Sequence, residues 1–295
     1  MKDKTVYALG FFDGVHVGHQ ALLAACRELS GNMVAAPGVI TFSGHPQALI
    51  SGQAPLLINS IEDRRALLAQ YGMEKILTIP FDRALMQMPW QEFFRRLVEQ
   101  YGAGAVVCGE DFRFGYRGEG TAEKLQQVCR EAGIPCRVVS QQTVDGVRVS
   151  STHIRSLLQQ GNLEQAVRFL GHPHILSGKV VTGRQLGRTI GIPTANTELP
   201  QGVLLPARGV YACSAAVEGN TYMAVTNVGS RPTVGGHHVT VEPWLLDFQG
   251  DLYDKTITLY FRKFLRPEKT FPSIEELKEE IQRNAQQTRD FFEKN

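Results

Sequence analysis

Hydrophobic and polar positions divide the first half of the chain into two alternating kinds of run. Short apolar runs predict strands, and the longer runs between them, in which apolar residues recur at helical spacing, predict helices. The predicted strands cover residues 5–10, 33–42, 74–81, 103–112 and 136–140, and the predicted helices cover residues 18–29, 60–72, 90–102 and 121–133. Strands that alternate with helices in this way predict a parallel sheet with helices on both faces.

Polar and turn-forming residues mark the ends of several of these runs. Ser60 precedes an acidic first turn, so it is the predicted N-cap of the second helix. Pro37 and Gly38 interrupt the second apolar run, which predicts an interrupted strand there. Ser151 and Thr152 form the predicted N-cap region of a pair of short helices.

The pattern changes after Gly171. Short β-rich runs separated by turn residues predict an antiparallel barrel rather than a continued series of strand–helix units. These runs are residues 175–183, 209–217, 222–229, 238–248 and 256–265. Ser273 is followed three residues later by Glu276, a capping box that predicts a C-terminal helix. The domain boundary is therefore predicted near residue 173, which gives domains of residues 1–172 and 173–295.

Composition and charge narrow the class of protein. The chain has 295 residues, enough for about two domains. Its net charge is +2, which gives no bulk argument for a nucleic-acid or membrane partner. The N-terminal stretch does not resemble a signal peptide, and no apolar run approaches the ~18 residues that a spanning helix needs. The five cysteines contain no CxxC pair, which favours a cytoplasmic location over a disulfide framework or a zinc site.

Residues 10–23 read GFFDGVHVGHQALL and lie where the first predicted strand passes into the first predicted helix. Open parallel sheets bind ligands at this kind of position. His16 and His19 lie three residues apart around Gly18, and they have three possible roles: metal ligands, core histidines or donors to a phosphate. A metal site needs further ligands, and none is close by in the sequence. A helix N-terminus offers free N–H groups to an anion, so a phosphate site and a structural turn both remain open.

This string resembles the N-terminal module of prokaryotic bifunctional riboflavin kinase/FAD synthetases, and HVGH resembles the HxGH motif of the nucleotidylyltransferase superfamily. Three further pieces agree in order, namely TFSGHP at 41–46, GEDFRFG at 109–115 and VSSTHIR at 149–155. The resemblance covers essentially the whole chain. It implies an N-terminal Rossmann-like nucleotidylyltransferase domain with a parallel sheet, followed by a riboflavin kinase-like antiparallel β-barrel with a terminal helix.

The resemblance implies that the N-terminal module transfers AMP from ATP to FMN, giving FAD and pyrophosphate. Such a transfer needs no protein nucleophile, because a phosphate oxygen of FMN attacks the α-phosphorus in line, so catalysis is mostly positioning and charge stabilisation. The implied catalytic residues are His16 and His19. The implied ATP site comprises Gly10, Phe12, Asp13, Gly14, His16, Gly18, His19, Ser151, Thr152 and Arg155, and the implied FMN or nucleotide site comprises His45, Asp111 and Arg113. The structural alternatives are a helix cap for Ser151 and an exposed loop acid for Asp111.

Residues 178–200 read GKVVTGRQLGRTIGIPTANTELP and hold a second candidate site. Glycines at this spacing also suit barrel turns, and no Walker A motif is present. The PTAN string resembles the riboflavin kinase module, which implies that Thr194 and Asn196 bind Mg²⁺ and ATP. A hydroxyl and an amide oxygen are suitable ligands for this ion. The other implied ATP or Mg²⁺ residues are Gly178, Lys179, Gly183 and Gly187.

Phosphoryl transfer to the 5′-hydroxyl of riboflavin also needs a base. Glu242 lies in the apolar run VTVEPWLLDF, where an outward-facing strand acid is the plain alternative. The resemblance implies that Glu242 is the catalytic base of the kinase. Residues 227–233 and 250–255 continue the match to the kinase module.

The chain departs from the family pattern at several positions, and none of them removes an implied catalytic side chain. The departures are at Phe11, Ser43, Gly44, His172, His174 and Pro243. Pro243 directly follows the implied base and removes a backbone donor beside it.

The combined prediction is a bifunctional enzyme that uses Mg²⁺ and ATP to convert riboflavin into FMN and then FMN into FAD. Its predicted partners are these small molecules, with neither nucleic acid nor membrane. Two alternatives are a monofunctional enzyme with one inactive module and a non-catalytic flavin-binding regulator. An aminoacyl-tRNA synthetase-like enzyme would need a KMSKS-like lysine loop and a basic tRNA-binding surface, and the sequence shows neither.

Overall fold

The computed structural model describes residues 4–183, 191–233 and 236–294. Contacts divide the chain into two compact units. The first unit holds Met1–Leu57 and Ile61–Ser151, and the second holds Ile58–Ser60 and Thr152–Asn295. The helices after Ser151 therefore pack with the second unit, and the domain boundary near residue 173 stays a prediction.

The first unit is built on a five-stranded parallel sheet, which confirms the predicted fold class. Its strands stand in the order β3-β2-β1-β4-β7. They are β1 (Thr5–Leu9), β2 (Ala36–Phe42), β3 (Lys75–Ile79), β4 (Ala103–Gly109) and β7 (Cys136–Val139). The strand order reverses between β1 and β4, so the residues after these two strands flank the switch point where such sheets bind ligands.

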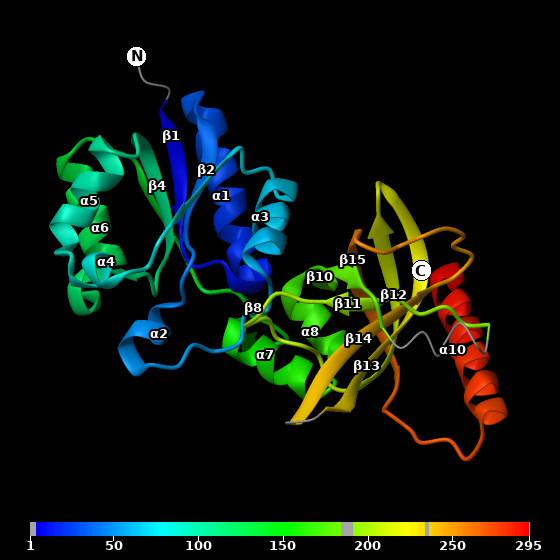
Figure 1. Cartoon of the computed structure of the whole chain (residues 1–295). Helices are drawn as coiled ribbons and strands as arrows, with labels where there is room; N and C mark the ends of the chain where they lie inside the picture. The colour runs from blue at the N-terminus through cyan, green and yellow to red at the C-terminus, as the bar shows by residue number, and fades with distance from the viewer. Residues whose placement is uncertain (1–3, 184–190, 234–235, 295) are drawn as a thin grey trace. The chain divides into compact units, whose positions relative to one another are not determined.

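Helices cover both faces of this sheet. Figure 1 shows α1 and α3 on one face and α4, α5 and α6 on the other. The helices are η1 (Asp13–Val15), α1 (Val17–Met33), α2 (Pro46–Ser51), α3 (Ile61–Gln70), α4 (Arg83–Gln87), α5 (Trp90–Glu99), η2 (Tyr116–Gly118) and α6 (Ala122–Glu131). Two short hairpins complete the unit, β5 (Arg113–Phe114) with β6 (Gly120–Thr121) and β8 (Thr143–Val144) with β9 (Val147–Arg148).

The predicted interruption at Pro37 and Gly38 is wrong, because β2 runs through both residues. Pro37 pairs with Val6, and its carbonyl accepts a hydrogen bond from the Glu74 N–H at 3.0 Å. A Cβ at Gly38 would lie 2.8 Å from Cγ2 of Thr5, so glycine permits the close approach of β1. The strand also begins later than predicted, because α1 continues to its end at residue 33.

Two predicted helix starts have different outcomes. Helix α6 has Thr121 as its N-cap, whose Oγ1 accepts a hydrogen bond from the Lys124 N–H at 3.3 Å. Helix α7 (Ser151–Gln159) instead includes Ser151 as its first helical residue. Ser151 therefore lies inside the helix that it was predicted to cap.

The second unit is a closed antiparallel barrel, again as predicted, with strands in the order β10-β11-β14-β13-β12-β15. These strands are β10 (His174–Val181), β11 (Asn196–Glu198), β12 (Gly209–Val217), β13 (Asn220–Thr233), β14 (Gly236–Leu245) and β15 (Thr256–Arg266). The short β11 was not predicted as a strand. It pairs with both β10 and β14, so it is needed to close the barrel.

Among the described residues of the second unit, three helices accompany the barrel. They are α7, α8 (Leu163–Leu170) and α10 (Ile274–Lys294). Helix α10 packs beside β12 and β13 through an apolar cluster that joins Ala285 to Val210 and Val225. The Oγ atom of Ser273 accepts a hydrogen bond from the Glu276 N–H at 3.2 Å, as the predicted capping box requires.

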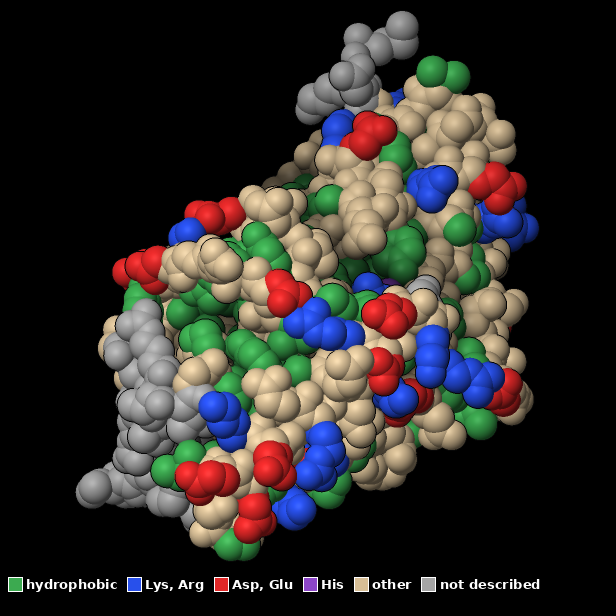
Figure 2. Space-filling model, turned by 90° about the vertical axis from the view of Figure 1, so that its right-hand side faces the viewer, with side chains coloured by type: hydrophobic (Ala, Val, Ile, Leu, Met, Phe, Trp, Pro, Cys, Tyr) green, Lys and Arg blue, Asp and Glu red, His purple; other side chains and the backbone are tan. Residues whose placement is uncertain are grey.

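The surface carries charges of both signs. Figure 2 shows Lys and Arg side chains interspersed with Asp and Glu over the displayed face. This distribution agrees with the small net charge of +2. A search of the described residues finds no helix that is both long enough and apolar enough to span a membrane.

His174 is a fully buried imidazole at the start of β10, next to the ring of Phe261 at a centroid distance of 5.6 Å. Burial, reinforced by the nearby His172, lowers the pKa of His174 to about 3. An unfolded histidine takes up its proton near pH 6.5. Between these two values the unfolded state binds one proton more, so stability decreases as pH falls through this window.

We therefore predict that His174→Phe makes the barrel less sensitive to acid. Between pH 8 and pH 5 the wild type should lose about 2 kcal/mol of unfolding free energy through this group, and the variant should not. The measurement is urea unfolding followed by Trp244 fluorescence in a Trp90→Phe background, which removes the only other tryptophan. Equal pH dependence in both proteins would contradict the prediction.

Candidate active sites

The first candidate site is the connection from β1 to α1. Phe12 has a φ of 58° and Gly14 a φ of 80°, and Val15 also has a positive φ. That conformation is uncommon for a residue other than glycine and occurs where surrounding contacts enforce it. The Phe12 ring is fully buried and lies 5.1 Å from the His19 ring. The buried Phe12 ring therefore anchors the turn in the core and packs against the His19 ring.

His16 is the N-cap of α1. Its Nδ1 accepts a hydrogen bond from the His19 N–H at 3.2 Å, so its Nε2 carries the proton in the neutral ring and is a potential donor. The two imidazoles stack with centroids 3.6 Å apart and an angle of 10° between their planes. A Cβ at Gly18 would lie 3.2 Å from the His16 ring, so glycine leaves room for this arrangement. The structure thus brings all three residues of the motif together.

His19 is held in its neutral form. Desolvation lowers its pKa well below the usual 6.5, and positive charge at His16 and Arg64 lowers it further. Within the described part of the chain, its Nδ1 is buried and has no hydrogen-bond partner. A neutral imidazole can donate a hydrogen bond to a phosphate oxygen through its other nitrogen.

Both histidines line a cavity of about 1280 Å³ at the carboxyl ends of the strands. Ligand pockets commonly measure about 300–1,000 Å³, so this cavity has room for two substrates of nucleotide size. Its lining changes from polar groups near the β1–α1 turn to an apolar wall. The residues of this wall include Phe81, Leu85, Met86, Phe93, Phe112, Phe114 and Tyr116. Phe112 and Phe114 stack at 5.6 Å, which offers a flat aromatic surface to a ligand.

Ser151, the last residue of the first unit, is bonded to the β1–α1 turn. Its Oγ donates a hydrogen bond to the Asp13 carbonyl at 2.9 Å, and it lines the cavity. The Ser151 hydroxyl therefore bonds to the turn, and Ser151 is the first residue of α7 rather than its N-cap. Thr152 and Arg155 follow on α7 in the second unit, so their part in the site stays a prediction.

The residues implied for the FMN or nucleotide site lie in two places. Asp111 and Arg113 both line the cavity. The Asp111 carboxylate accepts hydrogen bonds from Arg148 at 2.7 Å and from Gln141 at 3.4 Å. His45 is the N-cap of α2, where its Nδ1 accepts a hydrogen bond from the Gln47 N–H.

Three features of this site were missed in the sequence. Arg148 pairs with Asp111 in the cavity wall, but it lies outside the VSSTHIR string by one residue. Phe112 and Phe114 alternate with Asp111 and Arg113 within GEDFRFG, and only the two charged residues were predicted as site residues. Arg64 lies in a helical run with an acidic start and looks like a surface residue, yet it is 1% exposed.

The second candidate site is at the rim of the barrel. The Ala195 N–H donates a hydrogen bond to the Pro243 carbonyl at 2.8 Å, which fixes the PTAN segment beside Glu242. Thr194 and Asn196 line a hollow of about 90 Å³ together with Asp251 and Tyr253. The structure therefore brings Thr194, Asn196 and Glu242 to neighbouring backbone positions, as the sequence implied.

Glu242 is half-buried on β14, opposite Asn227 of β13. Pro243 has no N–H to donate, and its hydrogen bond with Ala195, the residue before β11, uses its carbonyl. A Cβ at Gly183 would overlap the Asn196 side-chain amide, so only glycine fits beside it. Gly178 is restricted in the same way by the Glu198 carbonyl.

Two further residues implied for the kinase site have different outcomes. Lys179 of β10 is exposed, and its Nζ forms an ion pair with Asp254 at 2.7 Å. Gly187 lies outside the described residues.

Comparison with known proteins gives concordant results for the two units. A family model described as FAD synthetase matches residues 1–153, and one described as riboflavin kinase matches residues 170–292. A bifunctional riboflavin kinase/FMN adenylyltransferase of Escherichia coli K12 is 39% identical over 292 residues, covering 97% of this chain and 92% of the relative. Its namesake in Bacillus subtilis is 32% identical over 295 residues, covering 98% and 93%.

A solved structure matches the whole fold. The crystal structure of a macrolide-efflux protein from Streptococcus pneumoniae has a TM-score of 0.88 and 30% sequence identity, covering 98% of this chain and 95% of that one. Its name refers to another activity, whereas the family models and the curated relatives agree with each other on flavin enzymes. Fold and sites define a class in which a nucleotidyltransferase-type α/β unit is joined to a barrel kinase unit. The chain belongs to the bifunctional riboflavin kinase/FMN adenylyltransferase family.

The environment of His19 predicts its titration. We expect its ring to remain neutral at pH 6, because desolvation and two neighbouring positive groups oppose protonation. The measurement is a pH series of imidazole NMR spectra with nitrogen labelling, in which His19→Asn identifies the resonance. A midpoint near the ordinary pH 6.5 would contradict the prediction.

Proposed function

We propose that this chain carries out both reactions of its family. The barrel transfers the γ-phosphate of ATP to the 5′-hydroxyl of riboflavin, which gives FMN. The α/β unit joins AMP from ATP to FMN, which gives FAD and pyrophosphate. The observation that carries the proposal is the pairing of His16 and His19 at the mouth of a two-substrate cavity, in a chain that has the kinase residues in its second unit. The cytoplasm remains the proposed location.

In the adenylyl transfer, an oxygen of the FMN phosphate attacks the α-phosphorus of ATP, and the bond to the β-phosphate oxygen breaks. His16, Gly18 and His19 at the start of α1 line the cavity. In the proposed reaction the N–H groups of this helix start and the Nε2 proton of His16 bind phosphate oxygens. Neutral His19 adds a donor without adding charge to the resting site. Preorganised donors of this kind stabilise the negative charge of the transition state.

The aromatic wall accounts for the second substrate. Phe112 and Phe114 present a stacked pair to the cavity, and an isoalloxazine ring is flat and largely apolar. Arg113 and Arg148 line the same cavity and provide positive charge for a phosphate group. FMN carries one flat ring and one phosphate, so it matches both parts of the lining.

In the kinase, the 5′-hydroxyl of riboflavin loses its proton as it attacks the γ-phosphorus, and ADP leaves. Glu242 is the proposed base for that proton. Its position beside the PTAN segment brings the base next to the residues proposed for the phosphates. This arrangement is what an in-line transfer between two bound substrates requires.

The proposal includes Mg²⁺ in the kinase site. The Thr194 hydroxyl and the Asn196 amide oxygen supply oxygen ligands, and Gly183 leaves the space beside the amide open. When bound with ATP, Mg²⁺ offsets phosphate charge. No group of three or more His, Cys, Asp or Glu is placed to hold a metal among the described residues, which suits an ion bound largely by the nucleotide.

We predict that the two activities can be removed separately. His19→Ala should decrease FAD formation from FMN by about 100-fold or more, because it removes a transition-state donor. Glu242→Ala should decrease FMN formation by about 100-fold or more, because it removes the base. Each variant should retain the other activity, measured by chromatography of reactions with riboflavin or FMN, ATP and Mg²⁺.

The same assay on the wild type separates the alternatives. FMN without FAD would indicate a monofunctional kinase, and FAD from supplied FMN alone would indicate a monofunctional adenylyltransferase. Flavin binding without turnover of ATP would indicate a flavin-binding regulator rather than an enzyme.

We also predict that Gly183→Ala weakens the kinase. The added methyl group would displace the Asn196 amide, so the KM for Mg–ATP should increase by about tenfold in FMN formation. FAD formation from FMN should be unchanged. Gly31→Ala is the matched control, because a Cβ there would meet no atom within 4 Å. An unchanged KM in the Gly183 variant would place Mg–ATP away from the PTAN segment.

A further inference from the structure

Arg64 is a charged side chain in the interior of the first unit. It extends from α3 and is 1% exposed, and desolvation lowers the pKa of its guanidinium, which nevertheless stays charged. A buried charge is costly unless it is hydrogen-bonded or paired. Its bonding partners therefore indicate why the fold retains it.

The guanidinium joins the ends of two strands. Nη1 donates a hydrogen bond to the Phe11 carbonyl at 2.9 Å, and Nη2 donates one to the Phe42 carbonyl at 2.8 Å. Phe42 is the last residue of β2, and Phe11 lies in the turn that follows β1. The Oγ1 of Thr41 donates a second hydrogen bond to the Phe11 carbonyl, at 2.8 Å. One planar fork thus fixes the start of the turn relative to the neighbouring strand.

The same guanidinium supports the cavity wall. Its central carbon lies 4.5 Å from the centroid of the Phe11 ring, which lines the cavity. Arg64 does not itself line the cavity, so it supports the wall through its contact with the Phe11 ring. In the described residues its Nε is buried with no hydrogen-bond partner, which leaves part of its positive charge uncompensated next to the turn.

The charged groups around Arg64 come from three elements. Asp13 of η1 and Glu62 of α3 stabilise its charge, and His19 of α1 is in turn kept neutral partly by that charge. His16 adds a second positive influence on His19. The arginine is therefore coupled to the turn through both hydrogen bonds and charge.

We propose that Arg64 is a positioning residue for adenylyl transfer, whose guanidinium holds the Phe11 and Phe42 carbonyls and so aims His16 and His19 at the nucleotide phosphates. This inference rests on the proposed function of the first unit. Small displacements of catalytic groups decrease rates strongly, by about 100-fold for a displacement near 1 Å.

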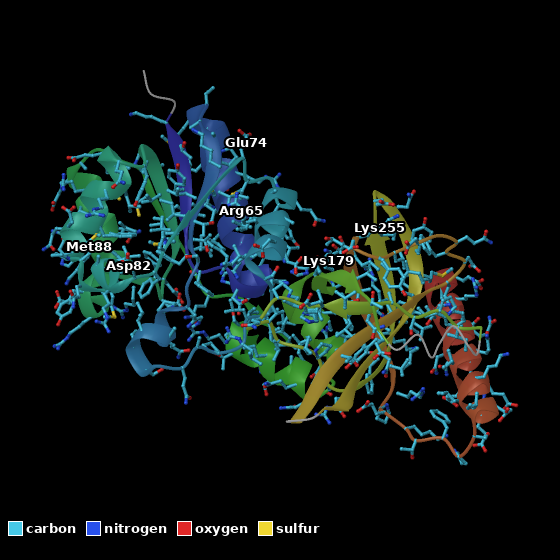
Figure 3. All side chains as sticks on the ribbon, in the orientation of Figure 1. Arg65, Glu74, Asp82, Met88, Lys179 and Lys255 are labelled. Atoms are coloured by element: carbon cyan, nitrogen blue, oxygen red, sulfur yellow. The ribbon has the colours of Figure 1, made fainter. Side chains whose placement is uncertain are left out.

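The test compares three variants of the full chain in both assays. Arg64→Met, which keeps the volume and removes the fork, should decrease kcat for FAD formation by about 100-fold, with a much smaller change in the KM for ATP. Arg64→Lys keeps the charge but not the fork, and should recover part of this loss. Arg65→Met is the matched control, because Arg65 is the next residue on α3 and is exposed, donating to Ile76 and Thr78 (Figure 3). It should behave as the wild type.

Two readouts separate positioning from general destabilisation. FMN formation should be unchanged in every variant, because the kinase residues belong to the other compact unit. His19 should titrate at higher pH in Arg64→Met than in the wild type, since one opposing charge has been removed. If Arg64→Met does not fold, Thr41→Val removes the other donor to the Phe11 carbonyl and should decrease FAD formation by about fivefold.

Two results would overturn the inference. One is a wild-type kcat for FAD formation in Arg64→Met, or in Thr41→Val where the methionine variant does not fold. The other is an equal loss of FAD formation in Arg64→Met and Arg65→Met. Failure of the wild type itself to form FAD would instead overturn the proposed function of the first unit.

Discussion

The first unit depends on keeping one buried turn in an uncommon backbone conformation. Between β1 and α1 the chain adopts a positive φ at three residues, Phe12, Gly14 and Val15. Its carbonyls cannot all be bonded within the turn, so side chains from elsewhere bond to them. Arg64 and Thr41 donate to the Phe11 carbonyl, and Ser151 donates to the Asp13 carbonyl. These partners come from three separate parts of the chain, so the turn is formed only when the sheet and its helices are assembled.

The two units meet a common chemical requirement with different architecture. Both reactions transfer phosphorus between oxygens, so neither needs a protein nucleophile, and both depend on positioning and charge. In the proposed adenylyl transfer the donors are those of a helix N-terminus at the switch point of the parallel sheet. In the proposed kinase site the Ala195 N–H donates to the Pro243 carbonyl, which places the PTAN segment beside Glu242.

Local patterns in the sequence were sufficient to predict the two fold classes and most of the elements, whereas the phosphate-binding role of the motifs stays a proposal. Strand–helix alternation predicted the parallel sheet, and closely spaced β runs predicted the barrel. Properties that arise only from tertiary contacts could not be read in this way. Pro37 was predicted to interrupt its strand because the partner that accommodates it, β1, is distant in sequence. Arg64 was not predicted as a buried residue because its acceptors are up to 53 residues away. Strand β11 was missed because its three residues are too few to show periodicity.

Two departures from the family pattern, Pro243 and His174, can be followed in the contacts of the barrel. Pro243 cannot donate a backbone hydrogen bond, yet the contact that the site needs is made by its carbonyl. His174 places an ionisable ring in the barrel interior, where burial keeps it neutral and its packing against Phe261 is that of an ordinary aromatic side chain. Neither side chain lines the hollow beside the PTAN segment, so neither determines the geometry of this rim. The residues that do fix that geometry, Gly183 beside Asn196 and Gly178 beside Glu198, are those where any larger side chain would collide.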